Sequence, residues 1–144
     1  MLIVSTPLYL AQHAATPDHL SLIEVLAATL ALFGIAFEAI ADWQLFRFKS
    51  NPANQGKVFD SGLWRYSRHP NYFGEMLVWW GLFGLAVNAP HGWAGLISPI
   101  VMTVFLLKVS GVTLLERDLK ERKPAYREYI NATNAFFPWI PKSS

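Results

Sequence analysis

Three long apolar segments separated by polar connections make up most of the chain. The first, Leu20 to Ala41, has about 22 residues, enough for a helix to cross a hydrocarbon core of roughly 30 Å. Two more, Phe73 to Val87 and Trp93 to Leu115, are joined by the short turn Asn88 to Gly92 and predict a helical hairpin. This pattern predicts about three membrane-spanning helices.

Local signals indicate where these helices begin and end. Asp18 precedes the first apolar segment and is a candidate N-cap. Pro70 suits the first turn of the second helix, where an N–H would be unpaired. From Arg47 to Ser61 the chain is polar and predicts a connection outside the membrane. The tail from Lys120 to Tyr129 predicts an amphipathic helix lying on the membrane surface, and Phe136 to Pro141 predicts an interfacial anchor.

The composition favours a membrane protein over a soluble one. Of the residues, 53% are hydrophobic and 15% are charged. Lys and Arg gather between Arg47 and Arg68 and in the tail from Arg117, while the turn Asn88 to Trp93 has none. By the positive-inside rule, the basic connection and the tail are expected in the cytoplasm. Nucleic acid is a poor explanation of these basic residues, because apolar segments flank them.

Metal and common nucleotide motifs are absent from the sequence. There is no cysteine, and the four histidines lack the close helical spacing of a zinc site, so we expect no bound metal. The nine glycines form neither a Gly-x-Gly-x-x-Gly nor a Walker pattern. A nucleotide would therefore be bound without a Rossmann or P-loop device.

Acidic side chains lie in the first apolar segment. Glu38 and Asp42 are four residues apart and share one face of a helix. An acid inside a membrane span is costly unless it is paired, protonated or turned into a polar cavity, which makes it a functional candidate. The alternative is that Asp42 lies at the interface and pairs with a basic neighbour such as Arg47.

The densest polar chemistry lies in the stretch Gly62 to Glu75. Free N–H groups at the start of a helix at Pro70 would hold an anion together with Arg65 and Arg68. Closure of the hairpin is expected to bring this stretch and the basic tail together on the cytoplasmic side. Arginine pairs with phosphate, Asn and Tyr bind amides and hydroxyls, and Trp64 offers a stacking face. The combination predicts a site for a soluble anionic cofactor.

The same stretch closely resembles the signature of the membrane family called domain of unknown function 1295. That family is similar to the C-terminal domain of steroid 5-alpha-reductases, to sterol C14 reductases and, more distantly, to isoprenylcysteine carboxyl methyltransferases. The resemblance covers the chain from about Glu38 to Pro138. The supporting matches are Ala41-Asp42-Trp43-Gln44 with Phe48-Lys49, and Glu116-Arg117-Asp118 followed by Tyr126 and Tyr129.

The resemblance implies an all-α, polytopic transmembrane helical bundle. Residues 1–144 would form a single membrane domain, equivalent to the C-terminal, cofactor-binding half of the family. It also implies NADPH bound in a polar cavity that opens to the cytoplasm. By motif, the residues expected at this cofactor are Gln44, Lys49, Trp64, Arg68, His69, Asn71, Tyr72, Arg117, Asp118 and Tyr126.

The implied reaction is the reduction of a C=C bond in a hydrophobic, steroid-like or isoprenoid-like substrate. Hydride passes from the nicotinamide, and a nearby acid supplies the proton. Tyr72 and Glu75 are the candidates for this acid, and for Glu75 the role requires apolar surroundings that keep the carboxyl protonated. The alternative for Glu75 is a buried acid that pairs with Arg68 or Lys108.

Two other functions compete with the reductase. A membrane methyltransferase that uses S-adenosylmethionine would share the Arg-His-Pro motif, but Asn71 after Pro70 and the triplet that begins at Glu116 favour the reductase. The other competitor is a non-catalytic membrane subunit or a fragment. Family members usually carry further helices before the segment that begins at Leu20, so a second copy or a partner chain would supply them. Membrane lipids and a hydrophobic small molecule are the remaining expected partners.

Overall fold

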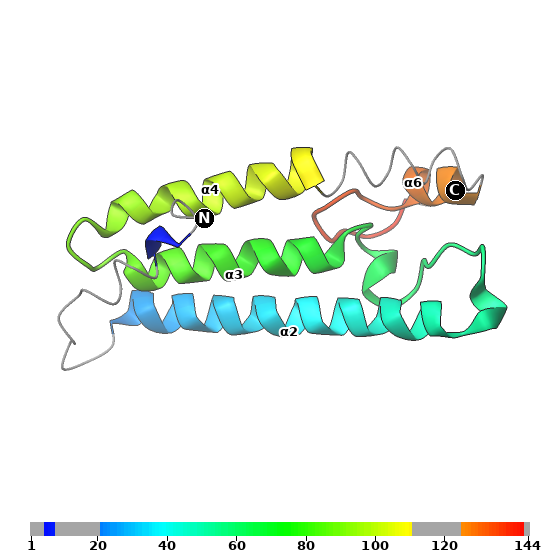
Figure 1. Cartoon of the computed structure of the whole chain (residues 1–144), viewed down its shortest axis with the longest axis horizontal. Helices are drawn as coiled ribbons and strands as arrows, with labels where there is room; N and C mark the ends of the chain where they lie inside the picture. Colours follow the sequence, from blue (N-terminus) through cyan, green and yellow to red (C-terminus); the bar gives the residue numbers. More distant parts are fainter. Residues whose placement is uncertain (1–4, 8–20, 111–124, 143–144) are drawn as a thin grey trace.

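The computed structural model describes residues 5–7, 21–110 and 125–142. These residues form helices and connecting loops, and no β-strand occurs among them. The predicted all-α class is therefore confirmed for this part of the chain. Three helices, α2 (Leu22–Ser50), α3 (Pro70–Ala86) and α4 (Ile97–Val104), run alongside one another, with α3 in the middle (Figure 1).

Helix α2 begins at a capping box. The Ser21 hydroxyl oxygen accepts from the backbone N–H of Glu24 at 3.2 Å, and the Glu24 carboxylate accepts from the backbone N–H of Ser21 at 2.7 Å. A serine followed three residues later by a glutamate is the usual sequence signature of this motif. The prediction that Asp18 caps the helix was wrong, because the helix starts at Leu22 and Asp18 lies outside the described residues.

Helix α2 also extends nine residues beyond its predicted end at Ala41 and includes the first part of the predicted polar connection. Arg47 and Lys49 lie in its last turn, where cations face the partial negative charge of a helix C-terminus. The helix stops at Ser50, because Asn51 precedes Pro52 and adopts an extended backbone. The connection outside the helix is therefore shorter than predicted.

Helix α3 packs along α2 through small residues. Pro70 occupies its first turn, as predicted. A Cβ atom added to Gly74 would lie 2.7 Å from the backbone nitrogen of Glu38, and one added to Gly81 would lie 2.7 Å from Cβ of Ala31. The two backbones thus approach as closely as glycine and alanine allow, which is the usual packing of membrane helices.

The return segment consists of three short helical pieces. The 3₁₀-helix η3 (Gly92–Leu96) leads into α4, which continues as the π-helix η4 (Phe105–Ser110). At the turn, His91 adopts a left-handed conformation with φ 61°, and a Cβ atom on Gly92 would lie 2.0 Å from the carbonyl oxygen of Ala86. The predicted hairpin is confirmed up to Ser110, and its end near Leu115 lies outside the described residues.

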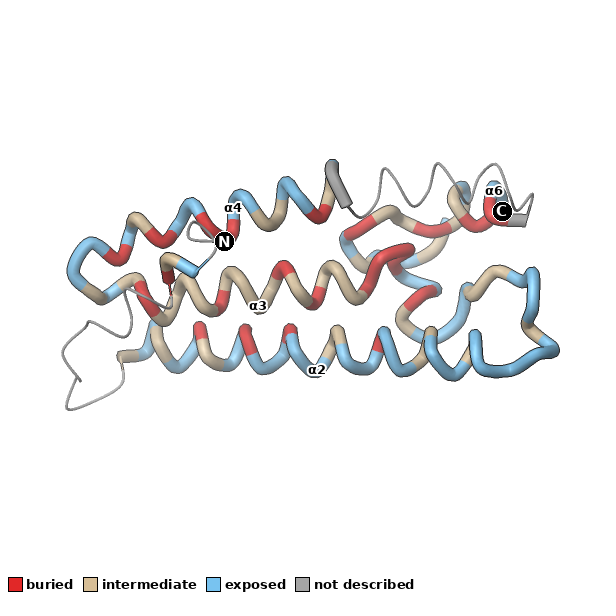
Figure 2. Tube along the Cα trace, in the orientation of Figure 1, coloured by how far each residue is buried: buried red, intermediate tan, exposed pale blue. Residues whose placement is uncertain are grey.

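Within the described ranges, α2 is the one helix that is long and apolar enough to cross a membrane by length and composition. Helix α3 has 17 residues, and the apolar helical run Gly92–Lys108 is also shorter than a typical span. Most of α2 is exposed, and its buried positions face α3 (Figure 2). The predicted bundle of about three spans therefore remains a prediction.

The tail carries the short helix α6 (Ala125–Ala132). It is amphipathic as predicted, with Tyr126 and Tyr129 buried and Arg127 and Glu128 exposed. The tyrosines face the protein, and the position of this helix at a membrane surface stays a prediction. The part of the predicted helix from Lys120 to Pro124 lies outside the described residues.

The predicted interfacial anchor is divided between the interior and the surface. Phe136 is buried in a small core with Met76 and Leu106, while Trp139 and Ile140 are exposed. The ring of Phe136 lies 6.1 Å from that of Phe73 on α3, measured between centroids, in an edge-to-face arrangement. The anchor prediction was therefore wrong for Phe136, because the tail folds back onto α3.

Candidate functional site

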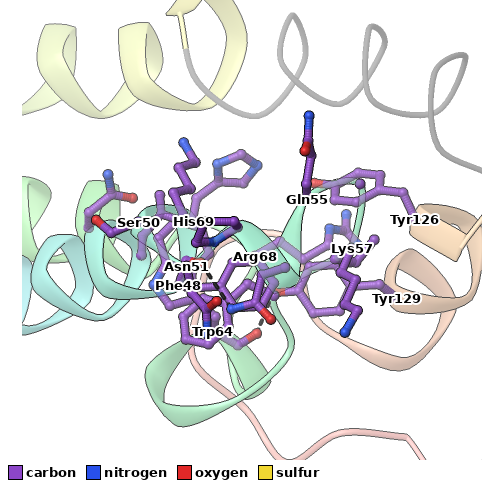
Figure 3. Close-up of a pocket in the computed structure, with 18 of the residues that line it drawn as sticks. Phe48, Ser50, Asn51, Gln55, Lys57, Trp64, Arg68, His69, Tyr126 and Tyr129 are labelled. Atoms are coloured by element: carbon purple, nitrogen blue, oxygen red, sulfur yellow. Dashed lines mark hydrogen bonds between the residues drawn. The ribbon is translucent and has the colours of Figure 1, made fainter.

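A cavity of about 750 Å³ lies where α2 ends and α3 begins, next to α6 (Figure 3). Its walls come from the end of α2, the loop that follows it, the stretch leading into α3, and α6. The lining residues are Leu45, Phe48, Lys49, Ser50, Asn51, Pro52, Asn54, Gln55, Gly56, Lys57, Val58, Phe59, Trp64, Arg68, His69, Asn71, Tyr72, Tyr126 and Tyr129. Cationic, amide and aromatic side chains thus share one site.

Most of the predicted cofactor residues line this cavity, although they are far apart in the sequence. They are Lys49, Trp64, Arg68, His69, Asn71, Tyr72 and Tyr126. Arg117 and Asp118, which were also predicted here, lie outside the described residues. The expectation that the central stretch and the tail come together is met by the part of the tail that the structure describes.

Gln44 and Glu75 are not among the lining residues. The Gln44 side-chain oxygen accepts a hydrogen bond from the backbone N–H of Leu63 at 2.9 Å. It lies against Gly62, which has φ 60°, and a Cβ atom there would come within 2.5 Å of that oxygen. Gln44 thus fixes the turn that precedes the site and does not itself line the cavity.

Glu75 lies on α3, one turn after Asn71. Its carboxylate forms a hydrogen bond with the side chain of Trp79, and Asp42 and Glu38 on α2 are its acidic neighbours. Lys108, one of its predicted alternative partners, has an exposed side chain. Glu75 therefore lies beside the cavity, on the side where α2 and α3 pack together.

The loop after α2 contributes lining residues that were not predicted, including Asn51, Gln55 and Lys57. Its turn signals indicated a loop, but they did not show where the loop would fold. Phe59 stacks on Phe48 with ring centroids 4.7 Å apart, and it also lies 6.2 Å from the ring of Trp64. These aromatic contacts turn the loop back over the end of α2 and close one side of the cavity.

The stretch leading into α3 is anchored to α2 on one side. It includes the 3₁₀-helix η2 (Gly62–Arg65). The indole N–H of Trp64 donates to the carbonyl oxygen of Ala41 at 2.9 Å, and Trp64 is buried. The N–H edge of the Trp64 indole is thus fixed against α2, while the residue also contributes to the cavity wall.

The same stretch is joined to the tail on its other side. The Arg68 guanidinium donates to the carbonyl oxygens of Ile130 and Thr133, each at 2.7 Å. The Ser67 hydroxyl donates to the carbonyl oxygen of Phe136 at 2.7 Å, and the Tyr129 hydroxyl donates to backbone oxygens of this stretch. We call this set of contacts between residues 64–69 and 129–139 the tail seam.

At the start of α3, two side chains are oriented by defined neighbours. The ring of His69 stacks on that of Tyr72 with centroids 5.5 Å apart and planes at 3°. The Asn71 amide nitrogen donates to Asp42 Oδ1 at 3.0 Å. The amide oxygen of Asn71 is buried and has no hydrogen-bond partner among the described residues. An amide held in this way offers an acceptor of fixed direction.

Asp42 thus has Asn71 as its hydrogen-bond partner, and not Arg47, the basic neighbour that the sequence suggested as an alternative. Its carboxylate accepts from Asn71, while the Arg47 guanidinium lies 5.0 Å from the ring centroid of Trp43, as a cation–π pair. Asp42, at the end of the apolar part of α2, therefore orients the side chain of Asn71, which lines the cavity.

A family model described as a protein of unknown function, DUF1295, matches residues 1–133. The chain belongs to the DUF1295 family. This confirms the family predicted from the Gly62–Glu75 stretch. The match includes all four walls of the cavity, with the whole of α6 among them.

Two curated relatives are similar to this DUF1295 chain over most of its length. An uncharacterized protein of Schizosaccharomyces pombe is 28% identical, with 98% of this chain and 46% of the relative covered. A Delta(14)-sterol reductase of Ascobolus immersus is 27% identical, with 81% of this chain and 28% of the relative covered. The chain thus spans less than half the length of these relatives. No solved structure matches it.

Proposed function

We propose that this DUF1295 protein is a membrane oxidoreductase that uses NADPH to reduce a C=C bond in a hydrophobic, steroid-like or isoprenoid-like substrate. The observation that carries the proposal is the cavity of about 750 Å³, which gathers the signature residues of the family. Its volume is within the roughly 300–1,000 Å³ of ligand pockets. The relative named as a Delta(14)-sterol reductase supports the class of reaction.

The donor set of the cavity suits a dinucleotide phosphate. Lys49 and Lys57 line it and provide cations for phosphate groups. Tyr126 and Trp64 provide aromatic surfaces of the kind on which a base or a nicotinamide ring stacks. Asn71 provides an amide for a carboxamide or a ribose hydroxyl. NADPH bound here would supply the hydride.

Tyr72 is the residue we propose for proton delivery. It lines the cavity, and its ring is held parallel to that of His69. A phenol has one O–H to donate and lies next to a second titratable ring, which is an arrangement suited to general acid chemistry. Glu75, three residues further along α3, is the alternative proton donor that we propose.

We further propose that the protein is an integral membrane protein with α2, α3 and the α4 segment as its spans. Large apolar side chains cover the exposed surface of α2, among them Leu26, Leu32 and Phe33. Lipid chains would cover these side chains, because contiguous exposed apolar surface marks an interaction site. We assign the end with the cavity to the cytoplasm, because the basic residues around it suit that side by the positive-inside rule.

The further helices that the family resemblance implies before Leu20 would complete the site for a hydrophobic substrate. We propose that they come from a second copy of this chain or from a partner chain. NADPH binding requires only the cavity described above, so it can be tested on this chain alone.

The test is calorimetric titration of the detergent-purified chain with NADPH and, separately, with S-adenosylmethionine. Lys49→Gln removes a cation of the cavity, and Lys142→Gln is the matched control, because Lys142 is also exposed and does not line the cavity. We expect Lys49→Gln to weaken NADPH binding by about 1 kcal/mol, the scale of an exposed ion pair. The control should bind as the parent chain does.

The outcomes separate the candidate functions. Binding of NADPH that weakens with added salt and in Lys49→Gln supports the reductase. Binding of S-adenosylmethionine alone would replace it with the methyltransferase. A helical, monodisperse chain that binds neither compound would be a non-catalytic subunit, and the proposal would fail.

A further inference from the structure

The guanidinium of Arg68 is bonded to the protein's own backbone. Arg68 is 8% exposed and lies between η2 and α3. Its Nη1 atom donates to the carbonyl oxygens of Ile130 and Thr133, each at 2.7 Å. Its backbone N–H donates to the carbonyl oxygen of Asn134 at 2.9 Å. All three acceptors lie at the end of α6 or directly after it.

This arrangement satisfies two requirements at once. The last carbonyl groups of a helix have no partner within the helix and carry partial negative charge. A buried guanidinium needs several acceptors, because it has lost its hydration. Arg68 and the end of α6 therefore stabilise each other. Both bonds come from the amino group at Nη1, whose two N–H directions are fixed by the guanidinium plane, whereas the ammonium group of lysine is a compact charge without that plane.

The position of α6 matters because this helix forms one wall of the cavity. Tyr126 and Tyr129 are both buried and both line it. The neutral contacts of the tail seam involve Ser67 and Tyr129, whereas Arg68 contributes a charged group with two short bonds. If the end of α6 moved away from Arg68, the wall would move with it.

We infer that Arg68 is a positioning residue that holds α6 and its two tyrosines in the cavity wall. The inference rests on the proposed function for its ligand, and it revises the role that the family resemblance implied for Arg68. In this arrangement the anionic groups of the ligand are met by Lys49 and Lys57, which line the same cavity. Arg68 acts on the ligand through α6.

The experiment measures the position of α6 without any ligand. The chain has no cysteine, so spin labels can be attached at introduced cysteines alone. Ala53→Cys and Arg127→Cys place them at exposed positions in the loop and on α6, neither of which lines the cavity. Double electron–electron resonance then reports the distance distribution across the cavity in the detergent-purified full chain.

Three substitutions are compared in this labelled background. Arg68→Lys keeps the positive charge but loses the planar guanidinium, and Arg68→Met removes both. Ser67→Ala is the matched control, because it removes neutral hydrogen bonds only, one to the carbonyl oxygen of Phe136 across the seam and one from the backbone N–H of His69. We expect a narrow distribution in the labelled parent, broad ones in both Arg68 variants, and a smaller change in Ser67→Ala. NADPH affinity should fall about tenfold or more in Arg68→Lys and Arg68→Met.

Each outcome decides the inference. A narrow distribution in Arg68→Lys with weakened NADPH binding would make Arg68 a direct ligand contact and overturn it. Narrow distributions in both variants would also overturn it. If the parent binds no NADPH but both variants broaden, the proposed function fails and the positioning role stands. If Arg68→Met does not fold, Arg68→Lys alone decides between these outcomes.

Discussion

The hydroxyl of Tyr129 donates a hydrogen bond to the carbonyl oxygen of Trp64, which lies 65 residues earlier in the chain. Tyr129 belongs to the tail, and Trp64 is fixed to α2 through its indole N–H. This single contact therefore connects α6 to α2 by way of the stretch that leads into α3. The cavity depends on such contacts, because its walls come from segments that no local signal connects.

Removal of this hydroxyl should loosen the tail. In Tyr129→Phe, the buried carbonyl oxygen of Trp64 loses a donor, and we expect a loss of about 1–3 kcal/mol in the free energy of unfolding. Denaturant unfolding of the detergent-purified chain, followed by circular dichroism, would measure it. Tyr66→Phe is the matched control, because Tyr66 is 45% exposed. Equal stability of the two variants would contradict a stabilising role of the contact.

The close packing of α2 and α3 leads to a second prediction. A methyl group at Gly74 would lie 2.7 Å from the backbone nitrogen of Glu38, so the two helices must separate. Gly74→Ala should therefore lower the free energy of unfolding by about 1–3 kcal/mol, the usual cost of overpacking. In Gly95→Ala the nearest atoms would lie at 3.5 Å, an ordinary contact distance. A thermal unfolding scan of both variants should show a lower midpoint for Gly74→Ala alone.

Asp42 should affect ligand binding through Asn71. In Asp42→Ala the Asn71 amide loses the acceptor that sets its orientation, and we expect NADPH to bind more weakly by about 0.5–1.5 kcal/mol. Asp42→Asn keeps a side-chain oxygen that accepts from Asn71, so its affinity should stay close to that of the parent. Calorimetric titration of the two variants measures the difference. Weaker binding in Asp42→Asn equal to that in Asp42→Ala would point to the charge of Asp42 instead.

Local signals predicted the starts of elements better than their ends or their partners. Pro70 was placed in the first turn of its helix, because a proline there has a local cause. The end of α2 was missed, because the charged residues of its last turn resemble those of a loop. The capping box at Ser21 was readable from its glutamate at the third position, although Asp18 was chosen instead.

The family signature predicted much of the cavity but not the way in which the cavity is held together. Arg68 was predicted as an anion-binding residue from its charge. Its observed acceptors are backbone carbonyl oxygens of Ile130 and Thr133, and every residue has such an oxygen. The sequence therefore has no side-chain pattern that identifies them. The stack of Phe59 on Phe48 was missed for the same reason, since aromatic residues are frequent throughout this chain.

The last prediction concerns the proton donor. If Tyr72 donates the proton, Tyr72→Phe should bind NADPH as the parent does. With a substrate that the parent reduces, the variant should oxidise NADPH more slowly, by about 10²-fold or more. Tyr72 lines the cavity and stacks on His69, and a phenylalanine would keep that stack while losing only the O–H. The rate is measured as NADPH absorbance over time, with the chain assembled with any partner it requires. Tyr66→Phe is the control, because Tyr66 does not line this cavity.

A Tyr72→Phe rate equal to that of the parent, combined with a large loss of rate in Glu75→Gln, would identify Glu75 as the proton donor. The donor would then lie between α2 and α3, next to Asp42, and the substrate would have to approach from that side.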